Sequence, residues 1–188
     1  MQMAVRLLPG PFTVDAYHRL AELGILDEDD RVELLDGQIV AMTAVGSRHA
    51  AAVGRLTRVF GERAGNRAIV WVQNPIVVSQ TWEPQPDVCL LRPRDDFYAA
   101  AHPRTDDALL VIEVAETSLE RDRDVKIPRY AAAGIPEAWL MDLAGDAVTT
   151  YREPRPEGYG EIVTRSRAET LRPVLLPELA VAVDEILG

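Results

Sequence analysis

The sequence predicts a mixed α/β fold, in which helices cover the faces of a central β-sheet. Apolar residues recur at helical spacing in three segments, and short runs rich in β-branched residues, bounded by turn residues, lie between them. The order is a helix, a hairpin, a second helix, and then strands with one further helix, which is typical of a sheet with helices packed on it. With 188 residues, 47% of them hydrophobic, the chain is long enough for one domain spanning 1–188.

A helix and a β-hairpin are expected first. Thr13 is suited to cap the helix, because its hydroxyl can accept a hydrogen bond from a free backbone N–H. Gly24 is suited to end it, because glycine readily adopts a left-handed backbone conformation. In the segment 31–42, two apolar strands flank Asp36-Gly37, a dipeptide that favours a tight two-residue turn.

The second helix is expected to start at Ser47 and to end at Gly65. Ser47 is predicted as its cap, and Val53, Leu56 and Phe60 follow at spacings of three and four, which places them on one face. That face is predicted to pack on the sheet.

The rest of the chain is predicted to supply most of the strands. Pro128 is tolerated only in the first turn of a helix, so Lys126 is expected at or just before the start of the third helix, which Gly134 ends. The segment 92–107 carries prolines and charges and is predicted to be a surface loop. Strands are expected at 68–72, 76–78, 87–91, 108–115, 138–142 and 148–151, with shorter ones after Gly160.

Composition favours a cytoplasmic protein that is not membrane-bound. Cys89 is the single cysteine, so an intrachain disulfide is impossible. Met1 to Gly10 has no export-signal pattern, and the longest apolar runs fall far short of the ~20 residues of a membrane helix. The net charge of −10 argues against broad attraction to nucleic acid. A local basic face remains compatible with phosphate contacts, and Arg48 and Arg55 are candidates for it.

Two carboxylates form the strongest candidate site. Glu113 lies inside the apolar strand 108–115, where an ionised carboxylate needs a cation or a proton. Asp87 begins another apolar strand, so the two acids could hold one divalent metal ion. The alternative is structural: Asp87 would be a turn residue at a strand entry and Glu113 an acid in a salt bridge.

The order of several motifs resembles the PD-(D/E)XK, restriction-endonuclease-like superfamily. Within it, the chain is similar to the Uma-type family of bacterial nucleases, long catalogued as a domain of unknown function, from about Thr13 to about Leu187. The residues that carry this resemblance are Glu33-Leu34-Leu35-Asp36-Gly37, His49, Gln85-Pro86-Asp87, Glu113-Val114, Lys126 with Tyr130, and Gly134-Ile135-Pro136-Glu137-Ala138-Trp139.

The resemblance implies a three-layer α/β/α restriction-endonuclease-like fold with a central mixed sheet, and a nuclease that cuts DNA with Mg²⁺ or Mn²⁺. Asp87 and Glu113 would bind the metal. Ala115 stands where the superfamily pattern has a lysine, so Lys126, on the adjoining helix, is expected to supply the cation. Glu33 would be a third acid facing the site, although an acid on a solvent-facing strand edge is the alternative.

Other expectations are less specific. His49 is a candidate for phosphate contact or proton transfer and Gln85 for orienting a phosphate or water, but both also suit ordinary positions at the ends of elements. His18 and His102 carry no predicted role, and a zinc hydrolase is not expected, because no histidines cluster in the sequence. A non-catalytic module that binds nucleic acid or protein is the alternative function. A homodimer or higher homo-oligomer would suit the cutting of two strands.

Overall fold

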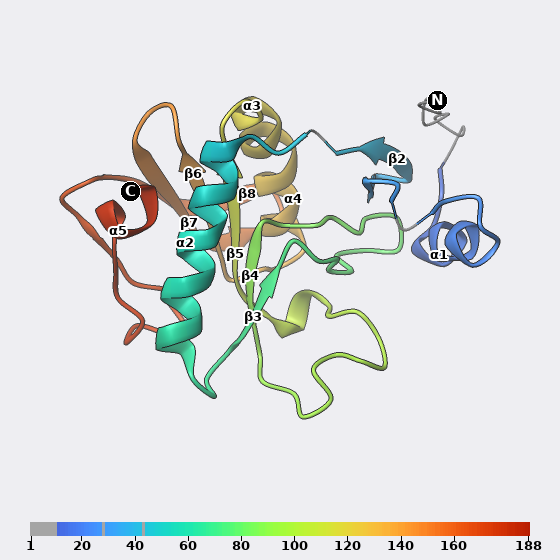
Figure 1. Cartoon of the computed structure of the whole chain (residues 1–188), viewed down its shortest axis with the longest axis horizontal. Helices are drawn as coiled ribbons and strands as arrows, with labels where there is room; N and C mark the ends of the chain where they lie inside the picture. Colours follow the sequence, from blue (N-terminus) through green and yellow to red (C-terminus); the bar gives the residue numbers. More distant parts are fainter. Residues whose placement is uncertain (1–10, 28, 43) are drawn as a thin grey trace.

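A six-stranded mixed sheet forms the centre of the computed structural model, which describes residues 11–27, 29–42 and 44–188 (Figure 1). The strand order is β3-β4-β5-β6-β7-β8, and β5 and β6 are the parallel pair among antiparallel neighbours. The predicted α/β class is confirmed. The strands are β3 (Ile69–Val72), β4 (Val88–Leu91), β5 (Ala108–Ala115), β6 (Glu137–Asp142), β7 (Ala147–Arg155) and β8 (Gly158–Ser166).

Helices cover the two faces of this sheet, so that all eight residues of β5 are buried. The long helix α2 (Ser47–Ala64) packs on one face with the short C-terminal helix α5 (Val183–Leu187), and Leu56 and Phe60 contact the core there, as predicted. The helix α4 (Ile127–Ala132) belongs to the core on the other face. Side chains alternate along a strand, which explains why β5 contributes to both cores.

The connection from β5 to β6 is helical and carries Lys126. It consists of α3 (Leu119–Arg121), a π-helical turn η2 (Asp122–Lys126) and α4. The N–H of Ile127 bonds the carbonyl of Asp122, five residues back, as a π turn requires. Pro128 has no N–H to continue the α-helical ladder, which accounts for the irregular winding ahead of it. Lys126 directly precedes α4 as predicted, although helical backbone already begins at Leu119.

The N-terminal helix and hairpin are confirmed and lie beside the sheet, at the right of the view in Figure 1. They are α1 (Val14–Glu22), β1 (Val32–Leu35) and β2 (Gln38–Ala41). Thr13 caps α1 by accepting the N–H of Ala16 at 3.2 Å. Asp36 and Gly37 have φ of 50° and 74°, the positive angles that a tight hairpin turn requires.

The structure corrects three local predictions. Gly46, not Ser47, is the N-cap of α2, and it makes no side-chain cap. The expected strand at 76–78 makes only isolated bridges, because its N–H groups bond Trp82, Pro84 and Pro103 in turns and a neighbouring loop. The strand β8 is nine residues long and starts before Gly160. The short strands that follow are β9 (Thr170–Leu171) and β10 (Val181–Ala182), which pair with each other.

The predicted loop 92–107 is irregular apart from the 3₁₀ turn η1 (Thr105–Asp107). Within the described ranges, no helix has the length and apolar character to cross a membrane. The expectation about Met1 to Gly10 lies outside the described residues.

Candidate functional site

A small cavity lies where the start of β4 and the end of β5 meet the hairpin and the first turn of α2. Its volume is about 80 Å³, which leaves room for a few ordered waters. Six of the residues predicted from sequence line it: Glu33, His49, Gln85, Asp87, Glu113 and Lys126.

Asp87, immediately before β4, and Glu113, on the neighbouring strand β5, face the same cavity. Val88 of β4 pairs with Ile112 of β5, so continuing this antiparallel register sets Asp87 opposite Glu113, on one face of the sheet. The Oδ2 atom of Asp87 accepts the backbone N–H of Val114 at 2.8 Å. The strand pairing therefore fixes the relative position of the two carboxylates.

Lys126 lies between two buried acids. Its Nζ atom is 3.3 Å from Oε2 of Glu33 and 3.3 Å from Oε1 of Glu113, and the three side chains are 5%, 1% and 3% exposed. Burial alone lowers the pKa of Lys126, but attraction to Glu113, Glu33 and further acids outweighs it and raises the pKa, so the ammonium stays charged. The structure thus brings the helix lysine to the acid that the strand supplies.

Glu113 has an unusual electrostatic environment. Its pKa is raised to about 8, chiefly because burial disfavours the charged carboxylate. Attraction to Lys126 lowers the pKa, whereas the like charges of Asp122 and Asp87 raise it. The hydroxyl of Tyr130 donates to Oε1 of Glu113 at 2.6 Å and fixes its orientation. Tyr130, expected only in the core, therefore also belongs to the site.

His49 reaches Asp87 from the first turn of α2. Its Nε2 atom is 3.0 Å from Oδ1 of Asp87. The pKa of His49 is raised, first of all by the hydrogen bond to Asp87. Burial lowers this pKa, and the negative charges of Asp87, Glu116 and Asp122 raise it. Its Nδ1 atom is buried and has no hydrogen-bond partner among the described residues. One ring nitrogen thus binds the candidate metal ligand while the other is left unsatisfied.

Gln85 is occupied by the hairpin. Its side-chain Nε2 donates to the carbonyl of Val32 at 3.1 Å, and its backbone N–H donates to Oε2 of Glu33 at 3.3 Å. Gln85 therefore holds β1, and with it Glu33, against the cavity.

The structure does not bring Arg48 and Arg55 into the cavity. Arg48 donates to the carbonyl of Leu143 at 2.7 Å and Arg55 to that of Leu187 at 3.1 Å, so both bind backbone groups in later parts of the chain. The arginines that do line the cavity are Arg31 and Arg121, which form no ion pair with any other described residue.

Sequence reasoning also missed two acids that line the cavity, Glu116 and Asp122. Asp122 precedes Lys126 by four residues in the crossover, a spacing that signals one helix face. Sequence reasoning gave His18 and His102 no role, and the structure brings them together at Glu83, apart from this cavity.

The lining of the cavity offers oxygen ligands of the kind that a hard cation takes. Among the described residues, its lining has five carboxylates, Glu33, Asp87, Glu113, Glu116 and Asp122, and three cationic side chains, Arg31, Arg121 and Lys126. Mg²⁺ and Mn²⁺ prefer carboxylate and water oxygens. Asp87 and Glu113 offer such oxygens from opposite positions of paired strands.

Comparisons with known proteins agree with this architecture. The model of the Uma2 family, described as a putative restriction endonuclease, matches residues 14–184. The crystal structure of a putative nuclease belonging to DUF820 from Anabaena variabilis ATCC 29413 is 16% identical and covers 94% of this chain and 98% of its own, with a TM-score of 0.72. At this identity the likeness concerns the fold. A search of the curated proteins gives no match.

Proposed function

This chain belongs to the Uma2 family of putative restriction endonucleases, and we propose that it is a divalent-metal-dependent endonuclease that hydrolyses phosphodiester bonds in DNA. The observation that carries the proposal is the buried ammonium of Lys126, held against Glu113 in a cavity that also contains Asp87. Phosphodiester hydrolysis needs acidic metal ligands and a cation beside the attacked phosphate, and little covalent help from the protein.

Asp87 and Glu113 are the residues that would hold Mg²⁺ or Mn²⁺. When bound, such an ion stabilises negative charge on the phosphate and lowers the pKa of an attacking water. Val114 and His49 hold Asp87 in place, and Tyr130 holds Glu113, so the direction of both carboxylates is fixed by the fold. Rigid positioning of ligands from regular strands favours a well-defined site.

Lys126 is proposed to hold the attacking water and to neutralise charge that develops on the phosphate. Its ammonium has three donors, and Glu33 and Glu113 orient it from two sides. Glu33 is then a positioning residue, because it fixes Lys126. Lys126 takes the place of the lysine that the superfamily pattern has at position 115, where this chain has Ala115.

The start of α2 is proposed to face the phosphate, which would there replace the carboxylate of Glu116 beside Gly46. Gly46, the N-cap of the 18-residue helix α2, lines the cavity together with His49. The N-terminus of a helix carries a partial positive charge and unpaired N–H groups, which favour an anion. His49, whose pKa is raised through its contact with Asp87, would add a proton donor there. Arg31 and Arg121 are proposed to take the DNA contacts first assigned to Arg48 and Arg55.

The test is cleavage of supercoiled plasmid by purified protein with Mg²⁺ or Mn²⁺, and with excess chelator. Glu113→Gln and Asp87→Asn keep the shape of each side chain and remove the charge, so both should abolish cleavage. The exposed Glu120, which does not line the cavity, gives a matched control: Glu120→Gln should cleave like the parent chain. Activity in chelator, or in Glu113→Gln, would contradict the proposal.

A non-catalytic DNA- or protein-binding module is the rival function. The net charge of −10 and Ala115 favour it. The two possible functions differ in metal dependence: an enzyme should gain thermal stability from Mg²⁺ and lose that gain in Asp87→Asn, whereas a degenerate module should show no such gain. A homodimer, which would supply two cutting sites, stays a prediction for light scattering to test.

A further inference from the structure

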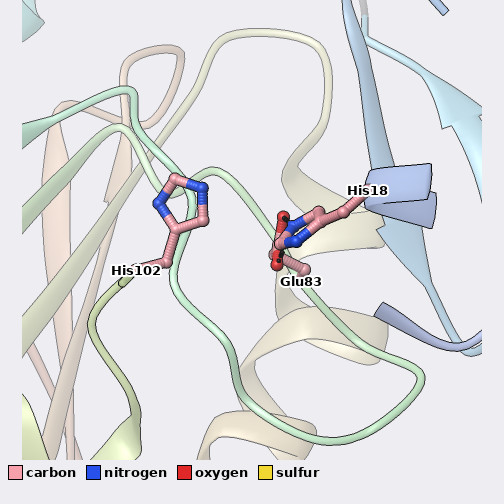
Figure 2. Close-up of side chains that lie close together, drawn as sticks. All are labelled: His18, Glu83 and His102. Carbon is pink, nitrogen blue, oxygen red and sulfur yellow. Dashed lines mark hydrogen bonds and ion pairs between the residues drawn. The ribbon is translucent and has the colours of Figure 1, made fainter. Parts of the chain in front are cut away.

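We infer that the chain has a second, separate metal site, formed by His18, Glu83 and His102, which takes Zn²⁺ or another divalent transition metal. One ligand atom from each residue can be chosen so that all lie within 4.8 Å of one another. Figure 2 shows His18 against Glu83, with His102 nearby on another segment of the chain. This inference does not depend on the proposed nuclease activity.

Glu83 supplies the strongest argument, because it is a buried acid with few partners. Its side chain is 2% exposed, and its one ion-pair partner among the described residues is His18, whose Nε2 lies 2.9 Å from both carboxylate oxygens. A buried carboxylate is costly unless a cation compensates it. A metal ion at this position would supply that charge.

The two histidines are placed to share an ion with Glu83. Their ring centroids are 5.6 Å apart at an interplanar angle of 65°, so the rings meet edge to face and are not stacked. Both line an open cavity of about 820 Å³, which gives an ion access from solvent. Around tetrahedral Zn²⁺, with bonds of ~2.0–2.1 Å, ligand atoms lie about 3.3 Å apart, so closure requires side-chain movements of about 1 Å.

Backbone hydrogen bonds hold the three ligand segments together without the ion. The N–H of Val14 at the start of α1 bonds the carbonyl of Gln80, which anchors the helix that bears His18. Glu83 exchanges both backbone bonds with Leu34 of the hairpin. The N–H of Val77 bonds the carbonyl of Pro103, which follows His102. Ligands that are preorganised in this way lose little entropy when they bind a metal.

The ligand set selects the kind of metal. Two imidazoles and one carboxylate suit Zn²⁺, Fe²⁺, Co²⁺ or Ni²⁺ and do not suit Mg²⁺, which prefers oxygen. A fourth position remains for water or for Asp15, which lines the same cavity three residues before His18 on α1. Bound in this way, the ion would tie α1 and the 92–107 loop to Glu83, which points to a stabilising role.

Zn²⁺ binding to the chelator-stripped chain, measured by calorimetry, tests the inference. In the Asp87→Asn background, where the acid cavity lacks one ligand, we expect one Zn²⁺ bound, and a Kd raised at least tenfold by His102→Ala and by His18→Ala. Gln80→Ala, an exposed residue that lines the same cavity without a ligand atom of this kind, is the matched control and should bind within twofold of the parent. His102 is exposed, so His102→Ala keeps the test valid if His18→Ala does not fold.

X-ray absorption at the zinc edge distinguishes this site from the acid cavity. Two imidazole ligands at ~2.0–2.1 Å are expected, and His49→Ala, which removes the remaining histidine of the chain, should leave the spectrum unchanged. Absence of Zn²⁺ binding in the parent chain would overturn the inference, leaving His18 and Glu83 as an ion pair. Binding that survives both His18→Ala and His102→Ala would also overturn it, as would loss of binding in His49→Ala.

Discussion

Replacing Lys126 with methionine should destabilise the chain far more than replacing a typical surface cation. Methionine keeps most of the apolar length and removes the ammonium from between Glu33 and Glu113. Removing one partner of a buried ion pair costs about 3–5 kcal/mol, because the charge left behind is poorly solvated. Here Glu33 and Glu113 both lose their cation, but Glu113, whose pKa is already raised, can take up a proton, so we expect a loss of about 3–5 kcal/mol.

Arg129→Met is the matched control, because it removes a cation one helical turn later. Arg129 pairs with Asp36 at the surface, where the two side chains are 39% and 51% exposed, so water can replace the lost partner. Exposed pairs contribute about 0.2–1 kcal/mol. Urea unfolding of the metal-free protein, followed by fluorescence of the buried Trp82 and Trp139, measures both losses.

A double variant shows whether the loss arises from this ion pair. Glu33→Gln combined with Lys126→Met leaves one acid fewer without a cation, so the two losses should fall short of additivity by at least about 1 kcal/mol. A loss for Lys126→Met no larger than that for Arg129→Met would refute the reasoning. Strict additivity in the double variant would refute it as well.

Three further predictions concern the fold. Cys89 is fully buried, and burial raises the pKa of its thiol, so a thiol reagent should label it only at the rate of unfolding; rapid labelling of the native chain would contradict the structure. In the turn, Gly37→Ala places a methyl group 2.7 Å from Cβ of Pro11 at a positive φ and should cost about 2 kcal/mol or more, whereas Gly54→Ala, in open space inside α2, should be neutral or stabilising in thermal melts. Burial is the main cause that raises the pKa of each tyrosine. Each therefore stabilises the fold below its unfolded pKa of 10, and that stability is lost as pH rises toward the folded values. Phenolate absorbance should develop at higher pH in the native chain than in urea, and coincident titrations would contradict this. The tyrosines are Tyr17, Tyr98, Tyr130, Tyr151 and Tyr159.

Local signals in the sequence predicted much of the fold. The Thr13 cap, the Asp36-Gly37 turn and the glycine that ends α2 each depend on a residue and its immediate neighbours, and the structure has all three. The strand predicted at 76–78 was wrong because turns and a loop from elsewhere in the chain bond its backbone. Apolar residues there are buried without pairing in a β-sheet. The length of β8 follows from its partner β7, which is equally long.

The candidate site was predictable where residues share an element or a strand pair, and less so elsewhere. Asp87 and Glu113 lie at the ends of adjacent apolar strands, a pattern visible in the sequence. The direction of Arg48 depends on the docking of residues near Leu143, which no local pattern encodes. His18 and His102 are far apart in the chain and meet only through the loop that packs beside Val77.

The position of Lys126 also bears on the order in which the chain folds. Glu113 lies only thirteen residues before it, on the strand that precedes the crossover, so this contact can form as soon as β5 and the helix meet. The contact with Glu33 additionally requires the hairpin, from much earlier in the chain, to dock. We therefore expect the complete ion-pair cluster to form after the folding transition state, so that weakening it accelerates unfolding more than it slows folding. By this reasoning, the same side chain that is proposed to face the phosphate also slows the opening of the native structure.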